Sequence, residues 1–506
     1  EQTPLIAFRA VELMHEAGIP RAALQFLPGT GEVVGAQLVA DSRVRGVIFT
    51  GSTEVAQIIN RTLARRSVEE GIDIPLIAET GGQNAMIVDS SALPEQVVND
   101  VVSSAFDSAG QRCSALRILC LQEDIADRTI EMLHGAMKEL RIGVTDRLVT
   151  DIGPVIDAEA QRNLQAHIDQ MRSKARNFHS LTLDAECSNG TFVAPTVMEI
   201  KDLSELKKEV FGPVLHILRY HRDQLGSLID QINGTGFGLT LGVHSRIDET
   251  IDFIVNRAHV GNIYINRNIV GAVVGVQPFG GEGKSGTGPK AGGPLYLKRL
   301  QRQPQIGVGG NTVFERQTPQ ALNALLVWAK AQKLPVVALG EQYAHHSPYQ
   351  VTMMLPGPTG ERNTLSFVPR GQIFCAASNT NTLLNQIAAV LATGNQAVLP
   401  PQTAALLPAN LPAEVKAQIV QADVAQTSAQ IALVASDLLR QYRQPFADKD
   451  GAIVSLIDTN EQDTIPLWRL VAEHALCVNT TAAGGNASLM AIDRKSTRLN
   501  SSHGYI

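Results

Sequence analysis

Short apolar segments alternate with longer amphipathic segments in the N-terminal part of the chain, up to Thr80. We expect the short segments to be β-strands, namely Ala23–Leu27, Gly46–Thr50 and Ile74–Ala78. The longer segments carry apolar residues at helical spacing and are predicted as α-helices, namely Leu5–Ala17, Glu32–Ala40 and Glu54–Arg66. Strand–helix alternation of this kind is typical of an α/β layer fold whose strands pair in parallel.

The alternation continues to about Leu300 and resumes beyond it, so the 506 residues are enough for two or three domains. Ala126–Leu140 and Ala158–Arg176 are the clearest helices of the middle part. Glycines and prolines gather in Gln277–Pro294, which predicts a long functional loop.

Charge and cysteine content limit the classes of partner. The chain carries 43 Lys and Arg against 49 Asp and Glu, which argues against nucleic acid or an anionic membrane as the main partner. Its five cysteines make no disulfide framework and have no metal-ligand spacing, so we expect no metal site and a reducing, cytoplasmic setting. No basic and apolar leader opens the sequence, and no apolar run approaches the length of a membrane span.

Glu79 and Cys113 are candidate catalytic residues. Glu79 ends the apolar segment Ile74–Ala78 and precedes Thr80 and two glycines, and strand ends are where α/β folds keep catalytic groups. Cys113 follows Gly110 and a polar pair. Each has a simpler explanation when taken alone, because a cysteine is most often a small buried apolar residue and a glutamate in a turn is often just solvated.

The two residue types fit the oxidation of an aldehyde when they act together. A free aldehyde gives up hydride poorly, so a thiolate first adds to the carbonyl, and the tetrahedral adduct then passes hydride to nicotinamide. The thioester that results needs an activated water for hydrolysis, which a proton-accepting glutamate provides. Cys113 would be the nucleophile and Glu79 the general base.

Five short motifs resemble those of the aldehyde dehydrogenase superfamily, in the order of that family. They are Phe49–Thr53, Glu79–Gly82, Gly110–Cys113, Glu209–Pro213 and Pro278–Gly281. The separation of Glu79 and Cys113 along the chain also equals the spacing of the family's catalytic pair. The resemblance implies a Rossmann-type cofactor domain beside a catalytic domain, and an NAD-dependent aldehyde dehydrogenase.

The resemblance also implies where the cofactor binds. Pro28–Gly35 is a glycine-rich turn whose N–H groups suit a phosphate, although it departs from the common dinucleotide fingerprint. The cofactor residues implied by the resemblance are Glu1 at the adenosine ribose, Gly31, Gly51 and Ser52 near the pyrophosphate, and Glu209 and Phe211 at the nicotinamide ribose. A carboxylate at the adenosine ribose favours a free 2′-hydroxyl, and therefore NAD over NADP.

Two elements of the family's pattern fall before Glu1. One is a lysine of the cofactor motif, which would stand shortly upstream of that residue. The other is an asparagine that shares the oxyanion hole with the Cys113 N–H, and it would stand further upstream. We therefore expect an incomplete cofactor domain and a chain that is weakly active or inactive by itself.

Ser114 and the glycine-rich loop indicate the substrate. The pair Cys113–Ser114 and the stretch Lys290–Pro294 resemble the L-glutamate γ-semialdehyde (pyrroline-5-carboxylate) dehydrogenases, a group within this family. The resemblance implies that the Ser114 hydroxyl and the N–H groups of Gly292 and Gly293 anchor the α-carboxylate of the substrate. A flexible surface loop, and an aldehyde dehydrogenase of another specificity, are the alternatives.

The second half of the chain looks like a degenerate copy of the first. Leu391–Pro401 resembles the family's lysine-bearing cofactor strand, with Pro400 in place of the lysine, and Cys477–Ala482 resembles Tyr264–Ile269. Cys375 is expected in a core strand. No second glutamate or cysteine motif lies between the two similar segments, which predicts a noncatalytic domain.

Over nearly its whole length the chain resembles bifunctional bacterial enzymes of proline catabolism. The resemblance implies an upstream proline dehydrogenase domain with FAD, which supplies the substrate, and a homo-oligomer. A noncatalytic lid or assembly fragment is the alternative from another functional class. We expect a partial NAD-binding domain at residues 1–80, a catalytic domain at 81–276, and a substrate-anchor loop with return to the cofactor domain at 277–303. A linker at 304–317, a noncatalytic dehydrogenase-like domain at 318–492 and a non-native tail at 493–506 are expected to follow.

Overall fold

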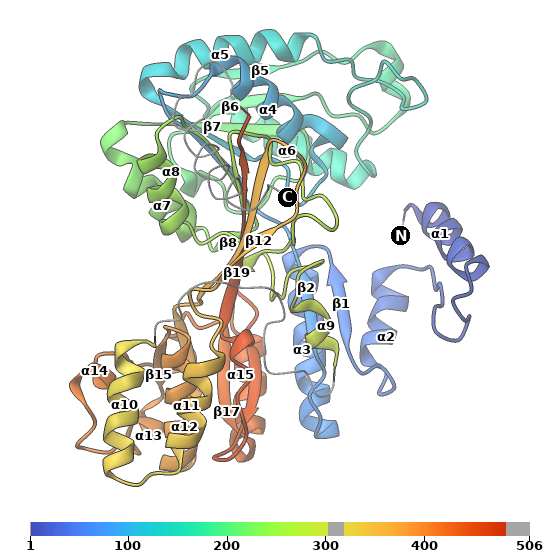
Figure 1. Ribbon diagram of the computed structural model, residues 1–506. Coiled ribbons are helices and arrows are strands. Elements are labelled where there is room, and N and C mark those ends of the chain that lie inside the picture. The colour runs from blue at the N-terminus through green and yellow to red at the C-terminus, as the bar shows by residue number, and fades with distance from the viewer. Residues whose placement is uncertain (1, 302–317, 482–506) are drawn as a thin grey trace, which may run out of the picture.

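The computed structural model describes residues 2–301 and 318–481 and has the α/β architecture that the sequence predicts (Figure 1). The predictions for Glu1, for the linker at 304–317 and for the tail at 493–506 lie outside the described residues. No described helix is both long and apolar enough to cross a membrane.

A ten-stranded sheet forms the largest layer, with the strand order β12-β13-β19-β10-β9-β3-β4-β7-β6-β5. Neighbouring strands from β10 to β6 are parallel, and β5 closes one edge antiparallel to β6. The strands that come from the chain before Leu300 are β3 (Ala85–Val88), β4 (Ile118–Gln122), β5 (Phe178–Ser180), β6 (Thr196–Glu199), β7 (Val214–Tyr220), β9 (Thr240–His244) and β10 (Asn262–Ile265). The helices beside them are α4 (Pro94–Phe106), α5 (Glu123–Lys138), α6 (Ala158–Arg172), α7 (Leu225–Gly234) and α8 (Asp248–Arg257).

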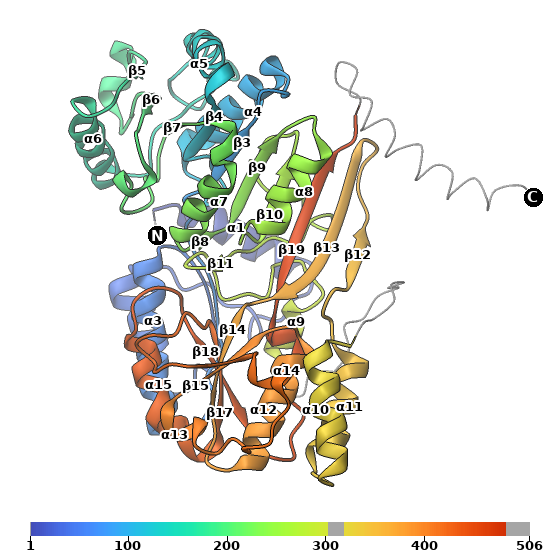
Figure 2. The ribbon, with the colours of Figure 1, turned by 90° about the vertical axis from the view of Figure 1, so that its left-hand side faces the viewer.

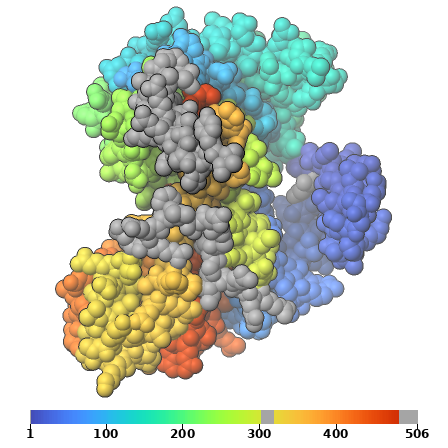
Figure 3. All heavy atoms as spheres, in the orientation of Figure 1, coloured from blue at the N-terminus to red at the C-terminus, as the bar shows by residue number. Residues whose placement is uncertain are grey.

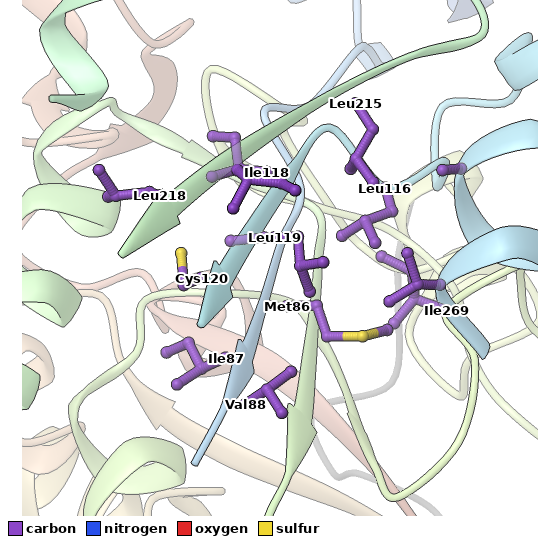
Figure 4. Packing of buried hydrophobic residues seen from close by; sticks show 14 of the residues in the cluster. Met86, Ile87, Val88, Leu116, Ile118, Leu119, Cys120, Leu215, Leu218 and Ile269 are labelled. Carbon is purple, nitrogen blue, oxygen red and sulfur yellow. The ribbon is translucent and has the colours of Figure 1, made fainter. Parts of the chain in front are cut away.

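The middle strands of this sheet are apolar runs with both faces covered. Every residue of β3 and β4 is buried, which is typical of parallel strands between layers of helices. Figure 4 shows Met86, Leu119 and Ile118 of these strands packed with Leu215 of β7. Full burial of each such side chain stabilises the fold by about 1.5–3 kcal/mol, so the loops at the strand ends rest on a rigid base.

The N-terminal segment, up to Glu79, forms a smaller layer. Strands β1 (Val47–Thr50) and β2 (Leu76–Glu79) pair in parallel, and helix α3 (Thr53–Glu70) connects them. The predicted helices near the N-terminus are confirmed as α1 (Pro4–Glu16) and as a π-helical turn (Gly31–Gly35) that continues into α2 (Ala36–Ala40). The predicted strand at Ala23–Leu27 is wrong. This segment is a turn followed by irregular chain, because no described strand lies beside it to pair with.

Apolar side chains of this small layer are open to solvent. Helix α1 buries none of its residues, and Leu5 and Ile6 are 81% and 74% exposed. In Figure 3 the dark-blue N-terminal residues project from one side of the molecule. An exposed apolar face of this kind marks a surface that packs against another segment.

The second half of the chain contains a five-stranded parallel sheet in the order β16-β15-β14-β17-β18. Counted along the chain this is 3-2-1-4-5, the strand order of a doubly wound nucleotide-binding fold. Its elements are helices α10 (Gln320–Ala331), α11 (Val336–His346), α12 (Thr380–Ala392), α13 (Pro401–Ala404), α14 (Ala413–Lys416) and α15 (Leu439–Asp448), and strands β14 (Gln372–Ala376), β15 (Gln396–Leu399), β16 (Ile419–Gln421), β17 (Ile431–Ala435) and β18 (Ser455–Thr459). Cys375 lies fully buried in β14, as predicted.

Matching helices of the two halves pack against each other. Helix α15 connects β17 to β18 as α3 connects β1 to β2, and the two helices lie side by side in both views (Figures 1 and 2). Arg443 forms an ion pair with Asp73 at 3.1 Å, and the Gln57 amide donates to the carbonyl of Gly451 at 2.8 Å. This arrangement fits the internal repeat that the sequence suggests.

Three strands of the second half extend the sheet of the first half. The hairpin of β12 (Thr352–Leu355) and β13 (Glu361–Pro369) joins β19 (Val471–Asn479), and β19 runs parallel to β10 (Figure 2). Tyr264 pairs with Cys477, so the two segments of similar sequence lie next to each other in register. Strands from both sides of the predicted boundary at residue 318 therefore belong to one sheet. The domain ranges stay predictions.

Candidate active site

Glu79 is the last residue of β2 and lies where several loops converge. Its Oε2 accepts a hydrogen bond from the N–H of Gly281 at 3.0 Å, and its backbone carbonyl accepts one from Gly51 at 3.2 Å. Its Oε1 is buried and has no hydrogen-bond partner among the described residues. A carboxyl oxygen without a partner in a buried position is available to a water or a substrate atom.

Burial raises the pKa of Glu79 to about 8. The Gly281 N–H and the ammonium of Lys290 favour the charged form, while the carboxylate of Glu473 disfavours it. Glu79 is therefore mostly protonated at neutral pH and becomes a base in the mildly alkaline range, which suits a group that takes a proton during turnover.

Cys113 follows a tight turn and is half-buried. Ser108, Ala109 and Gly110 have φ angles of 56°, 54° and 65°, so the chain takes a left-handed path just before the thiol. Burial raises the pKa of Cys113, and the carboxylates of Glu209 and Glu79 raise it further, while the N–H groups of Ser114 and of Cys113 itself oppose this. The thiol thus lies within electrostatic reach of both glutamates.

Asn84 holds the loop that carries the thiol. Its side-chain NH₂ donates to the carbonyls of Cys113 at 2.7 Å and Ala115 at 2.9 Å, and its carbonyl oxygen accepts from the N–H of Thr240 at 3.1 Å. Asn84 follows Glu79 closely in the sequence, but no pattern there assigns it a role. Since it joins β3 to the nucleophile loop, it fixes the thiol relative to Glu79.

Arg117 is a second supporting residue, and sequence reasoning missed it. It is fully buried, donates to the carbonyls of Gly110, Arg112 and Gly212, and forms an ion pair with Glu209 at 3.0 Å. The available signal was a charged residue inside the apolar run that leads into β4. A buried guanidinium needs partners of this kind, because an unpaired charge in the interior is strongly unfavourable.

Glu209 lies against the loop after Glu79. A Cβ atom at Gly81 would overlap the Glu209 carboxylate, so a larger residue at this position would displace that carboxylate. Burial raises the pKa of Glu209, and its partner Arg117 opposes that rise. Phe211 is exposed, with its ring centroid 5.2 Å from the Arg117 guanidinium.

The Gly51–Ser52 turn lies between the carboxyl end of β1 and the N-terminus of α3. The Ser52 hydroxyl accepts from the N–H of Val55 at 3.2 Å and caps the helix. A helix N-terminus at the carboxyl edge of parallel strands suits a pyrophosphate. Gly31 opens the π-helical turn before α2, and Glu1 lies outside the described residues.

The residues expected to bind a substrate carboxylate already have internal partners. The Ser114 hydroxyl is buried and donates to the carbonyl of Val270 at 2.5 Å. The N–H of Gly293 donates to the carbonyl of Lys290 at 3.1 Å, while Gly292 is exposed with a φ of 71°. Their joint role as a carboxylate clamp stays a prediction.

A half-buried thiol within electrostatic reach of a buried carboxyl group whose pKa is raised to about 8 fits the class of enzymes that use a cysteine nucleophile. Residues 1–304 match the sequence profile of the aldehyde dehydrogenase family. The chain belongs to this family, which confirms the resemblance inferred from the five motifs.

Similar proteins have names that refer to proline utilization or to the oxidation of 1-pyrroline-5-carboxylate. The chain is 53% identical over 516 aligned residues to the bifunctional protein PutA of Escherichia coli K12, an alignment that covers 97% of this chain and 39% of that protein. A crystal structure of bifunctional proline utilization A (PutA) has 58% identity and a TM-score of 0.57, over 59% of this chain and 30% of that one. A 1-pyrroline-5-carboxylate dehydrogenase from Thermus with bound NAD has 36% identity and a TM-score of 0.54, over 58% of this chain and 57% of that one. The chain thus spans about two fifths of the length of the curated relatives named PutA.

Proposed function

We propose that this chain, as part of a longer parent protein, carries out the NAD-dependent oxidation of L-glutamate γ-semialdehyde, formed from pyrroline-5-carboxylate, to L-glutamate. The observation that carries the proposal is the pair of Cys113 and Glu79 in one loop cluster, with the pKa of Glu79 raised to about 8. The proline-catabolic names of the relatives support the choice of aldehyde.

The reaction begins with the thiol. Cys113 gives its proton to solvent, and its sulfur adds to the aldehyde carbon while the N–H of Cys113 donates to the oxyanion that forms. NAD, when bound, accepts the hydride that this adduct releases. Glu79 then takes a proton from a water, the hydroxide adds to the thioester carbon, and the C–S bond breaks to give L-glutamate and the thiolate.

The side chains around the site fit such a cofactor. The space that the absent Cβ of Gly81 leaves is filled by Glu209, whose carboxylate would accept hydrogen bonds from the two hydroxyls of the nicotinamide ribose. The Gly51–Ser52 turn at the N-terminus of α3 would hold the pyrophosphate, with Gly31 nearby. Phe211 would flank the ribose.

Substrate selection is assigned to Ser114, Gly292 and Gly293. To bind an α-carboxylate, the Ser114 hydroxyl must exchange its bond to Val270, and the Gly293 N–H its bond to Lys290. A site that pairs buried polar groups with substrate rejects compounds without those groups by up to about 10⁴–10⁵-fold. Simple aldehydes would then be poor substrates.

The wider setting of the activity follows from the relatives. We propose a cytoplasmic homo-oligomer in which a proline dehydrogenase domain with FAD precedes this chain in the parent protein and supplies its substrate. Residues 318–492 would be a noncatalytic copy of a dehydrogenase, since Pro400 replaces the cofactor lysine at the N-terminal cap of α13.

The test compares substrates in the protein at its full natural length. NADH formation is followed with pyrroline-5-carboxylate and, at equal concentration, with acetaldehyde. We expect kcat/KM to be at least about 10²-fold higher with pyrroline-5-carboxylate. Equal values would assign the chain to another specificity, and failure to bind NAD would favour a noncatalytic lid.

A further inference from the structure

The second half of the chain places a buried carboxylate against the active-site loop. Glu473 belongs to β19, and its Oε2 accepts a hydrogen bond from the backbone N–H of Lys290 at 2.8 Å. Its Oε1 is buried and has no hydrogen-bond partner among residues 2–301 and 318–481. A buried carboxylate with an unpaired oxygen is costly in free energy, and its charge interacts strongly with the ionisable groups around it.

Lys290 connects this carboxylate to Glu79. Its ammonium donates to the Asn262 side-chain oxygen at 2.8 Å and to the carbonyl of Gly280. The next residue, Gly281, donates its N–H to Glu79. The short backbone stretch Gly280–Gly281 therefore holds both the ammonium and the catalytic carboxyl group.

Other charged groups pack around these three. Arg370 of the chain after β13 lies near both Glu473 and Glu282, and Glu282 pairs with His474 at 3.5 Å. Tyr296 of α9 (Tyr296–Leu300) lies within electrostatic reach of Glu79. Arg370 and the Glu282–His474 pair thus belong to the same buried cluster, and the ammonium of Lys290, held by Asn262 and Gly280, lies within electrostatic reach of Glu473 and Glu79.

We propose that Glu473 is a positioning residue for the reaction, through which the noncatalytic half of the chain controls when Glu79 acts as a base. This inference rests on the proposed function and extends it to a residue outside the family's own domain, since the family match ends at residue 304. Glu473 acts through Lys290 and does not itself contact substrate.

Two carboxyl groups, those of Glu473 and Glu79, compete for the charge of one ammonium. While Glu473 is ionised, it takes up part of the stabilisation that Lys290 offers, and Glu79 retains its proton. When Glu473 loses its charge, its repulsion of the Glu79 carboxylate and its share of the Lys290 charge both disappear, and Glu79 ionises at lower pH. When Lys290 loses its charge, both carboxyl groups are unfavourable as anions, and Glu79 ionises at higher pH.

The test uses hydrolysis of 4-nitrophenyl acetate, which needs no cofactor. The Cys113 sulfur attacks the ester carbonyl, nitrophenolate leaves, and Glu79 takes a proton from the water whose hydroxide releases acetate from the thioester. Steady-state release after the initial burst reports this second step. The pH at which it reaches half its maximum is measured for wild type, Glu473→Gln, Glu473→Asp and Lys290→Met in the full-length protein.

We expect Glu473→Gln to move this midpoint down by roughly one pH unit, the size expected of one charge felt through protein. Lys290→Met moves it up, and Glu473→Asp, which keeps the charge, leaves it near wild type. Glu414→Gln on the exposed helix α14 is the matched control and shifts nothing.

A Glu473→Gln variant that loses rate equally at every pH, with an unmoved midpoint, overturns the inference and reduces Glu473 to a packing role. The same holds if Glu473→Asp shifts as much as Glu473→Gln. Wild type that hydrolyses the ester but forms no NADH from pyrroline-5-carboxylate contradicts the proposed function instead, so the two failures are distinct.

Discussion

The pH dependence of thioester hydrolysis tests the role of Glu79 as a base. Burial raises the pKa of this carboxyl group to about 8, so about one molecule in ten has the base form at pH 7 and about nine in ten have it at pH 9. The rate of the hydrolytic step is therefore expected to rise about tenfold between pH 7 and pH 9 and then to level off. Glu79→Gln keeps the shape of the side chain, cannot accept a proton, and is expected to lower this step by about 10²–10⁴-fold at every pH.

The assay separates the two halves of the reaction. Rapid mixing of enzyme, NAD and pyrroline-5-carboxylate gives a burst of NADH from hydride transfer, followed by a slower steady state limited by hydrolysis. Glu79→Gln is expected to keep the burst and lose the steady state. A burst that falls together with the steady state would refute the reasoning, because Glu79 would then act before the thioester forms. So would a steady state in wild type that is independent of pH between 6 and 9.

Three further predictions concern the surroundings of this pair. Arg117→Met leaves Glu209 and three carbonyls without their partner and should destabilise the protein by about 3–5 kcal/mol, measured by urea unfolding; an unchanged midpoint would contradict it. Gly81→Ala forces the Glu209 carboxylate aside and should weaken NAD binding in a fluorescence titration, whereas Gly135→Ala in α5, where a Cβ meets nothing, should not. A chain extended upstream toward the length of the PutA relatives should form NADH faster than residues 1–506 purified alone, because α1 exposes its apolar face in the shorter chain; equal rates would show that the added segment is dispensable.

The elements predicted from apolar periodicity match the structure closely. Helix α3, strands β1 and β2, and the long helices α5 and α6 lie within a few residues of their predicted ranges. Each of the helices buries one stripe of side chains at helical spacing, and the strands are short apolar runs between turns. The strand predicted at Ala23–Leu27 is wrong because the apolar pattern does not show whether a partner strand is present. A short apolar run becomes a strand only where a neighbouring strand supplies its hydrogen bonds, and periodicity does not reveal neighbours.

Some residues of the candidate site could be predicted from the sequence, and others could be found only from the structure. Short motifs predict Cys113 and Glu79 as catalytic residues, because the spacing of chemically unusual residues is visible along the chain, and the structure brings the two within electrostatic reach of each other. Asn84 and Arg117 act by linking strands that are far apart in sequence, and their partners are mostly backbone carbonyls that no side-chain pattern reveals. The same applies to Glu473, which reaches the site only because β19 lies beside β10.

The central claim is that aldehyde oxidation proceeds through a covalent bond to Cys113. The most direct measurement is NADH formation from pyrroline-5-carboxylate by Cys113→Ala in the full-length protein, together with a titration of NAD binding. Without the sulfur no adduct forms that can release hydride, while the groups assigned to the cofactor remain, so we expect turnover below a few per cent of wild type with unchanged NAD affinity. Turnover above that level with intact binding would contradict the account.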